Sequence, residues 1–188
     1  MIPASEDVLA AWQRSEVIVD AETVSRAVDQ TAVRISLALK DANPLLLCVM
    51  HGGLPYCGRL IDRLRFPLEL GYVHVARYRD STAGGALDWI ASPVQNVTGR
   101  QVLIVDDVLD QGDTLAAVCE WAAAAGAARV WSTVLNRKDV PGNRAVEVDF
   151  AALQCPDRYL IGCGMDYKGY WRNLPDIRAL PEDMEDSG

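Results

Sequence analysis

The sequence lacks the features that mark several common classes of protein. Its five cysteines form no CxxC pair and are odd in number, so they predict neither a disulfide framework nor a zinc site. They are expected to be small buried side chains in a reducing compartment. No apolar run is long enough to span a membrane, and Glu6 and Asp7 stand where a signal peptide would carry positive charge. These absences favour a cytoplasmic protein.

Positive charge is also scarce in this chain. Lysine and arginine number 18 against 26 acidic residues, which gives a formal net charge of -8. Because nucleic-acid binding depends on a basic footprint, this balance argues against DNA or RNA as the main ligand. It is compatible with a small phosphorylated substrate, which backbone amides and a metal ion can hold.

The patterns that are present indicate one α/β domain. Half of the 188 residues are hydrophobic, which is enough for a single core, and the chain shows no repeats or linker. Apolar runs predict buried strands at residues 45–50, 102–105 and 130–135, with further strands at 70–78 and 146–153. Helices are predicted from an N-cap at Asp20 to Asn43-Pro44, through residues 60–64, and at 115–125. Such alternation implies right-handed crossovers and a mostly parallel twisted sheet flanked by helices.

The stretch from Val102 to Leu115, VLIVDDVLDQGDTL, is the most informative part of the chain. A buried strand delivers two adjacent carboxylates, Asp106 and Asp107, to the edge where an open α/β sheet binds ligands. Gly112 then lets the chain turn tightly before a helix, so that several amide hydrogens converge on one anion. This combination suits a sugar phosphate, because the amides hold the phosphate while the carboxylates hold hydroxyl groups or magnesium.

Simpler readings exist for each of these residues. Asp110 and Thr114 could cap a helix while the acidic pair is solvated, but the whole string after a parallel strand favours a site. A phosphatase of the aspartyl-phosphate type usually spaces its carboxylates one residue apart, whereas these are adjacent. A P-loop is excluded, since no Gly-Lys-Ser/Thr occurs.

This string resembles the phosphoribosyl pyrophosphate motif of type I phosphoribosyltransferases, in which a hydrophobic strand precedes two acidic residues and a turn ending in Gly-x-Thr. The similarity is greatest to the hypoxanthine-guanine branch. Four further segments match in the right order: the pyrophosphate loop at Met50-His51-Gly52-Gly53, the start of the mobile catalytic loop at Arg77-Tyr78, the strand end with the purine lysine at Leu135 to Lys138, and the base-recognition segment at Asp157 to Arg172. The resemblance implies one domain over residues 1–180, with a hood lobe built from both ends. The last residues, 181–188, are expected to be a disordered acidic tail.

The resemblance also implies which residues contact each part of the substrates. For the phosphoribosyl group and its 5-phosphate they are Asp106, Asp107, Asp110, Gln111, Gly112, Asp113 and Thr114. For pyrophosphate they are His51, Gly52, Gly53 and Arg172. For the purine they are Lys138, Tyr159, Leu160 and Asp166, and for Mg²⁺ they are Asp106, Asp107 and Asp166. Asp110 would be the general base at purine N7, Lys138 would donate to the 6-oxo group, and Tyr159 would stack on the base.

Three residues differ from the family's pattern. His51 stands in place of a common lysine, Arg77 in place of a serine, and Asp113 adds a negative charge to the phosphate turn. The Asp113 side chain is therefore expected to point to solvent. The resemblance further implies a cis peptide bond between Met50 and His51, and a loop from Tyr78 to residue 87 that closes over the site.

The implied activity is purine salvage in a homo-oligomer, a dimer or a tetramer. Phosphoribosyl would pass from phosphoribosyl pyrophosphate to hypoxanthine or guanine, with Mg²⁺, giving IMP or GMP and pyrophosphate. Lys138 favours a 6-oxopurine because lysine only donates, and strand alternation is expected to send Arg137 to the opposite face. The alternatives are an enzyme of the same fold that uses xanthine or another base, and a non-catalytic nucleotide-binding regulator. The acidic charge and the presence of Asp110 count against the regulator.

Overall fold

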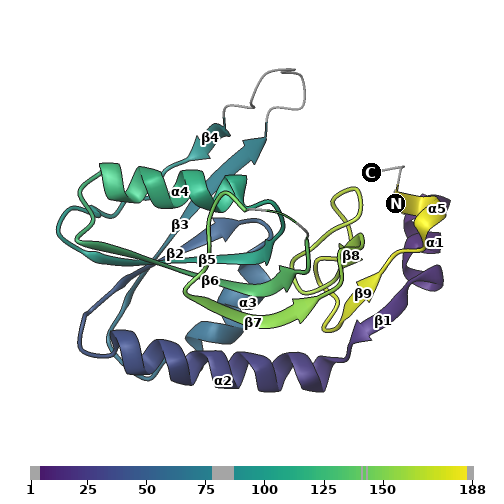
Figure 1. Ribbon diagram of the computed structural model, residues 1–188, viewed down its shortest axis with the longest axis horizontal. Helices are drawn as coiled ribbons and strands as arrows, with labels where there is room; N and C mark the ends of the chain where they lie inside the picture. Colours follow the sequence, from purple (N-terminus) through teal and green to yellow (C-terminus); the bar gives the residue numbers. More distant parts are fainter. Residues whose placement is uncertain (1–4, 78–86, 141, 143, 186–188) are drawn as a thin grey trace.

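The computed structural model describes residues 5–77, 87–140, 142 and 144–185, which form two sheets and the helices that cover them (Figure 1). The larger sheet contains β2 (Leu45–Met50), β3 (Glu69–Arg77), β4 (Leu87–Ala91), β5 (Gln101–Leu109), β6 (Arg129–Lys138) and β7 (Phe150–Cys155). Its helices are α2 (Ala21–Leu39), α3 (Leu54–Ile61) and α4 (Asp113–Ala124). The smaller sheet contains β1 (Glu16–Val19), β8 (Leu160–Ile161) and β9 (Ile177–Ala179), accompanied by α1 (Glu6–Arg14) and α5 (Glu182–Glu185).

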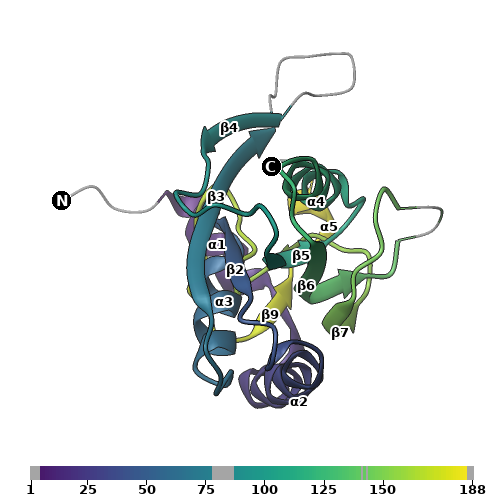
Figure 2. The same cartoon turned by 90° about the vertical axis from the view of Figure 1, so that its left-hand side faces the viewer.

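The six-stranded sheet has the order β4-β3-β2-β5-β6-β7. Each neighbouring pair is parallel except β3 with β4, which is antiparallel. Figure 2 shows the sheet between α4 on one face and α2 on the other. The predicted fold class, a mostly parallel sheet flanked by helices, is confirmed. Because β2 and β5 are parallel neighbours, the loops that follow them lie at the same edge of the sheet.

The long helix α2 begins at the N-cap that the sequence predicts. The Asp20 side chain accepts a hydrogen bond from the Thr23 amide at 2.8 Å, which satisfies one of the free amides of the first turn. The face that carries Val24, Ile35 and Leu39 is fully buried in the core beneath the sheet. Among the helices that the structure describes, none combines the length and the apolar character needed to cross a membrane.

The three-stranded sheet joins segments from the two ends of the chain. Its order is β1-β9-β8, and both pairs are antiparallel. Figure 1 shows this smaller sheet on the right, close to the carboxyl ends of β6 and β7. The sequence patterns did not predict the strands β1, β8 and β9, because strands of two to four residues carry too little periodicity to be recognised. The helix α1 was not predicted either.

The expectation of a disordered tail from residue 181 is wrong for the part that the structure describes. Residues Glu182–Glu185 form α5, and Met184 is 7% exposed in a cluster with Val8 and Leu180. Asp183 also pairs with Arg14 of α1 at 2.8 Å. The buried Met184 side chain and the ion pair of Asp183 hold this polar turn against α1 and its cluster, while residues 186–188 lie outside the described part.

Other boundaries also differ from the predictions. The strand expected at 102–105 continues as β5 to Leu109, so the acidic pair lies within the strand and not after it. The ladder with β6 explains this, since its pairing extends to Leu109 opposite Arg137. The strand expected at 146–153 is β7, which begins at Phe150. An antiparallel strand, β4, was not predicted, and the expected catalytic loop between β3 and β4 lies outside the described residues from Tyr78 onward.

Candidate active site

A cleft of about 340 Å³ opens at the carboxyl ends of β2 and β5. Its lining comes from the end of β2 and the loop after it, from β3, from the acidic part of β5, from the turn into α4 with its first residues, and from the segment after β8. The residues are Val49, Met50, His51, Gly52, Val75, Asp106, Asp107, Val108, Asp110, Gln111, Gly112, Thr114, Leu115 and Arg172. The structure thus brings together residues predicted for the phosphoribosyl group and for pyrophosphate.

The acidic pair forms the floor of this cleft. Asp106 and Asp107 are each only 8% exposed, and burial raises the pKa of both carboxyl groups above the ordinary value. The positive charge of Arg172 opposes this rise, and each carboxylate accepts one backbone amide, from Asp107 and Val108 respectively. Two buried carboxyl groups so close together favour a ligand that brings positive charge or hydroxyl donors.

The turn between β5 and α4 is built to receive an anion. Gly112 has φ of 89°, a left-handed conformation that favours glycine, and it stands at the N-cap position of α4. The first amides of the 12-residue helix therefore face the cleft beside the hydroxyl of Thr114. Asp113 is exposed and does not line the cleft, as its negative charge requires.

A second cavity of about 280 Å³ adjoins the first. Its lining is Asp107, Val108, Asp110, Lys138, Tyr159, Leu160, Met165 and Asp166. All four residues predicted for the purine are present in this list. The two cavities share Asp107, Val108 and Asp110, so the predicted general base stands at their junction.

Lys138 carries the positive charge of the second cavity. Its Nζ lies 3.1 Å from Asp110 Oδ2 and 3.7 Å from Asp157 Oδ1, and its side chain is 14% exposed. Arg137 points elsewhere and pairs with Glu147 at 3.2 Å. The predicted divergence of these two neighbouring side chains is therefore confirmed. Asp157 was not predicted as a site residue, and its place beside Lys138 depends on a contact between β6 and the segment after β7.

The segment from β8 to Arg172 is held by charged hydrogen bonds. Arg172 Nη2 lies 2.6 Å from Asp166 Oδ1, and Arg172 Nη1 donates to the carbonyl of Gly164 at 2.6 Å. The second oxygen of Asp166 accepts the Gly169 amide at 2.6 Å. Tyr159 packs edge-on against Tyr167, with ring centroids 6.0 Å apart. These contacts fix the wall of the second cavity and aim Arg172 into the first.

The loop after β2 packs closely against its surroundings. A Cβ at position 53 would lie 2.6 Å from the carbonyl oxygen of Val105, so only glycine fits there. Gly164, with φ of 115°, approaches the carbonyl of Gly52 so closely that a Cβ would overlap it. The expected cis peptide bond between Met50 and His51 is present.

The site residues fit a magnesium ion of the kind that is held partly by its substrate. Among the described residues, no group of three or more carboxylate, histidine or cysteine side chains forms a complete metal cage. Mg²⁺ commonly takes one or two protein carboxylates and completes its shell with water and substrate oxygens. Asp106 and Asp107 offer this arrangement, whereas both oxygens of Asp166 are engaged by Arg172 and Gly169. Tyr78 lies outside the described residues, and of Arg77 only the backbone is described, at the end of β3.

Comparisons with known proteins agree with this geometry. The phosphoribosyl transferase domain model matches residues 15–168. The hypoxanthine-guanine phosphoribosyltransferase of Streptococcus pneumoniae is 29% identical, with 90% of this chain and 94% of that protein aligned. The protein of the same name from Streptococcus thermophilus is 30% identical over 76% of this chain and 79% of its own.

A solved structure titled as a hypoxanthine-guanine-xanthine phosphoribosyltransferase is 27% identical to this chain, with a TM-score of 0.80. The alignment covers 89% of this chain and 97% of that structure. The family model spans most of the chain, and its matched range includes the acidic pair, the phosphate turn and the lysine of the second cavity. This chain belongs to the phosphoribosyl transferase domain family.

Proposed function

We propose that this chain transfers phosphoribosyl from phosphoribosyl pyrophosphate to hypoxanthine or guanine and releases IMP or GMP and pyrophosphate. One observation supports this most strongly. A cleft with an anion-binding turn and an acidic floor meets a second cavity that contains a lysine, and Asp110 stands between them. A sugar phosphate and a base that occupied the two cavities would react at this junction. The names of the relatives support the same activity.

The binding roles follow from the chemistry of each wall. The amides of the turn that contains Gly112, together with Thr114, hold the 5-phosphate. The amide of Gly52 and the guanidinium of Arg172 hold the pyrophosphate, since an arginine fork matches phosphate oxygens. The amide of Gly53, also predicted for this role, donates instead to the carbonyl of Val49 at 2.9 Å, and Gly53 does not line the cleft. This arrangement leaves the anomeric carbon between the leaving group and the second cavity.

The pairing of Lys138 with Asp110 explains a preference for 6-oxopurines. A 6-oxopurine presents the acceptor O6 beside N7, which carries the proton to be removed. An ammonium beside a carboxylate complements this pair, so Lys138 donates to O6 while Asp110 accepts the N7 proton. Adenine presents an amino group at the same position, which would leave the ammonium facing a donor.

Displacement occurs at the anomeric carbon, where positive charge develops as pyrophosphate departs, as in glycoside cleavage. We propose that Asp106 and Asp107 hold Mg²⁺ together with the substrate, with Asp166 nearby at the other cavity. The ion supplies charge neutralisation for the leaving pyrophosphate. The buried acidic pair itself orients the ribose hydroxyl groups by accepting their hydrogen bonds.

The decisive experiment measures nucleotide formation from each free base with phosphoribosyl pyrophosphate and Mg²⁺. IMP and GMP are the expected products, with adenine and pyrimidines inactive. Xanthine is tested in the same assay, because one similar structure is titled with xanthine as a third substrate. Nucleotide binding without turnover of any base would overturn the proposal and favour the regulator.

The expected homo-oligomer, a dimer or a tetramer, is a separate proposal. It is supported by large apolar side chains that stand exposed on the strands β3 and β4, among them Tyr72 at 48% and Ile90 at 56%. Light scattering after size-exclusion chromatography measures the mass directly, and a monomer at micromolar concentration would refute it.

A further inference from the structure

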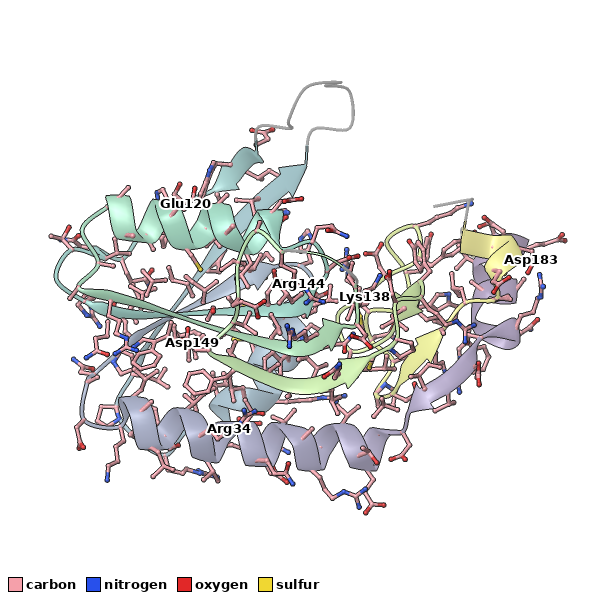
Figure 3. The ribbon with its side chains drawn as sticks, viewed as in Figure 1. Arg34, Glu120, Lys138, Arg144, Asp149 and Asp183 are labelled. Carbon is pink, nitrogen blue, oxygen red and sulfur yellow. The ribbon has the colours of Figure 1, made fainter. Side chains whose placement is uncertain are left out.

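Arg144 joins the two halves of the site through their backbones. Its Nε donates to the carbonyl oxygen of Asp110 at 3.0 Å, and its Nη2 donates to the carbonyl oxygen of Lys138. Figure 3 shows Arg144 and Lys138 next to each other near the end of β6. The guanidinium thus bridges the residue proposed as general base and the residue proposed to read the purine. Arg144 lines neither of the two cavities.

Asp110 and Lys138 are not themselves a pair of the β5–β6 ladder. Pairing between β5 and β6 ends with Leu109 opposite Arg137. Asp110 follows that last pair, and Lys138 continues along β7, where it pairs with Cys155. Asp110 and Lys138 therefore lie one residue beyond the ladder, where side-chain contacts add to the constraint from the last backbone pair. Their ion pair is one such contact, and the fork of Arg144 is the other.

The residues after Arg144 extend the same contact along the phosphate turn. The amide of Ala145 donates to the carbonyl of Gln111 at 3.0 Å, next to the contact between the Arg144 side chain and the carbonyl of Asp110. Two consecutive residues of this segment are thus hydrogen-bonded to two consecutive residues of the phosphate turn. The side chain of Val146 lies against Gly112, where an added Cβ would be 3.2 Å from Val146 Cγ1. The segment 144–146 therefore supports the turn that receives the 5-phosphate.

We propose that Arg144 is a positioning residue, which sets the distance between the phosphate turn and the purine cavity without touching substrate. A guanidinium suits this role, because its planar donors hold two acceptors in a fixed relation that a single ammonium cannot reproduce. The inference rests on the proposed function for the identity of the ligands. A nucleotide product spans both cavities, so its binding depends on their relative position, whereas ribose 5-phosphate occupies one cavity alone.

The experiment compares Arg144→Ala and Arg144→Lys with the unchanged protein. Calorimetry measures the dissociation constants of GMP and of ribose 5-phosphate, and steady-state kinetics measures kcat and KM. Because a displacement of about 1 Å at a reacting centre lowers rates on the order of a hundredfold, Arg144→Ala should lower kcat by roughly that factor. Arg144→Ala should also weaken GMP binding about tenfold or more, because the carbonyls of Asp110 and Lys138 both lose a charge-assisted hydrogen bond and the two cavities are no longer held in register. It should change ribose 5-phosphate binding little, because the cleft that binds this ligand remains.

Arg34 provides a matched control on the opposite face. It donates to the backbone carbonyl of Ala151 at 2.6 Å and to Thr31, far from both cavities (Figure 3). Arg34→Ala removes a comparable contact and should leave kcat and both dissociation constants near the original values. Thermal unfolding of all variants separates loss of fold from loss of position.

The outcomes discriminate between positioning and a merely structural contact. Arg144→Lys keeps the charge but has a single donor nitrogen in place of the two that contact Asp110 and Lys138, so it should recover part of the GMP affinity but not all of it. Equal weakening of both ligands, or an Arg144→Ala that behaves like Arg34→Ala, would overturn the inference. If Arg144→Ala does not fold, full GMP affinity and full kcat in Arg144→Lys would also overturn it. Absence of any turnover in the unchanged protein would instead refute the proposed function. The change in GMP affinity relative to ribose 5-phosphate affinity would still test the role of Arg144.

Discussion

Replacing Gly164 with alanine tests whether the close contact between the segment after β8 and the loop after β2 sets the geometry of the cleft. Gly164 has φ of 115°, and a Cβ there would overlap the carbonyl oxygen of Gly52 and lie 2.9 Å from the Cβ of Asp107. Both neighbours line the cleft, and the nearer atom belongs to the backbone. The loop must therefore move, because no flexible side chain can give way.

The expected magnitude has two parts. The positive φ alone strains any side chain by roughly 1–3 kcal/mol. The overlap adds a further cost of about 1–3 kcal/mol, the usual range for overpacking. Relief of the overlap shifts the loop by on the order of 1 Å, which lowers catalytic rates about a hundredfold when it displaces groups that hold the substrate. We therefore expect a large loss of kcat/KM for phosphoribosyl pyrophosphate together with moderate destabilisation.

Gly169 separates these two parts. It belongs to the same segment and has φ of 86°, but an added Cβ there would meet nothing within 4 Å. Gly169→Ala should therefore show the backbone strain alone, with kinetics close to those of the original protein. Thermal unfolding and initial rates at varied phosphoribosyl pyrophosphate measure both variants. The reasoning is refuted if Gly164→Ala matches Gly169→Ala in melting temperature and in kcat/KM.

Three further predictions concern Asp110, Lys138 and Asp106, with Arg137→Ala as the control for Lys138→Ala. Asp110→Asn should fold normally and lower kcat about a hundredfold or more, as loss of a general base does, and near-normal turnover would remove Asp110 from that role. Lys138→Ala should raise KM for hypoxanthine and guanine and weaken discrimination against adenine. Arg137→Ala should do much less, because Arg137 pairs with Glu147. Steady-state kinetics of both variants with hypoxanthine, guanine and adenine measures the difference. Asp106→Asn should raise the melting temperature of the free protein at neutral pH. Burial raises the folded-state pKa of the Asp106 carboxyl well above its ordinary value of 3.8. The original protein therefore loses stability relative to the variant as the pH rises above 3.8, and the difference in melting temperature should grow with pH over that range. A difference that did not change with pH would contradict this explanation.

The sequence by itself determined the class of the fold and the position of the chemistry. Apolar runs separated by an amphipathic helix such as the one capped by Asp20 are local patterns, and local backbone preferences are enough to interpret them. The string from Asp106 to Thr114 is also local, because a strand, a turn and a helix N-terminus follow one another along the chain. Its amides and carboxylates were therefore predictable before any tertiary contact was known.

Tertiary structure decided how those pieces meet. Asp157 approaches Lys138, and Arg144 approaches Asp110, only because strands separated in the sequence are packed together, and no local pattern marks Asp157 or Arg144. The short strands of the smaller sheet and the packed Met184 depend on apolar surface that the far end of the chain supplies. A segment this short gains little from its own periodicity and is ordered by burial against partners, which is a property of the folded molecule and not of the local sequence.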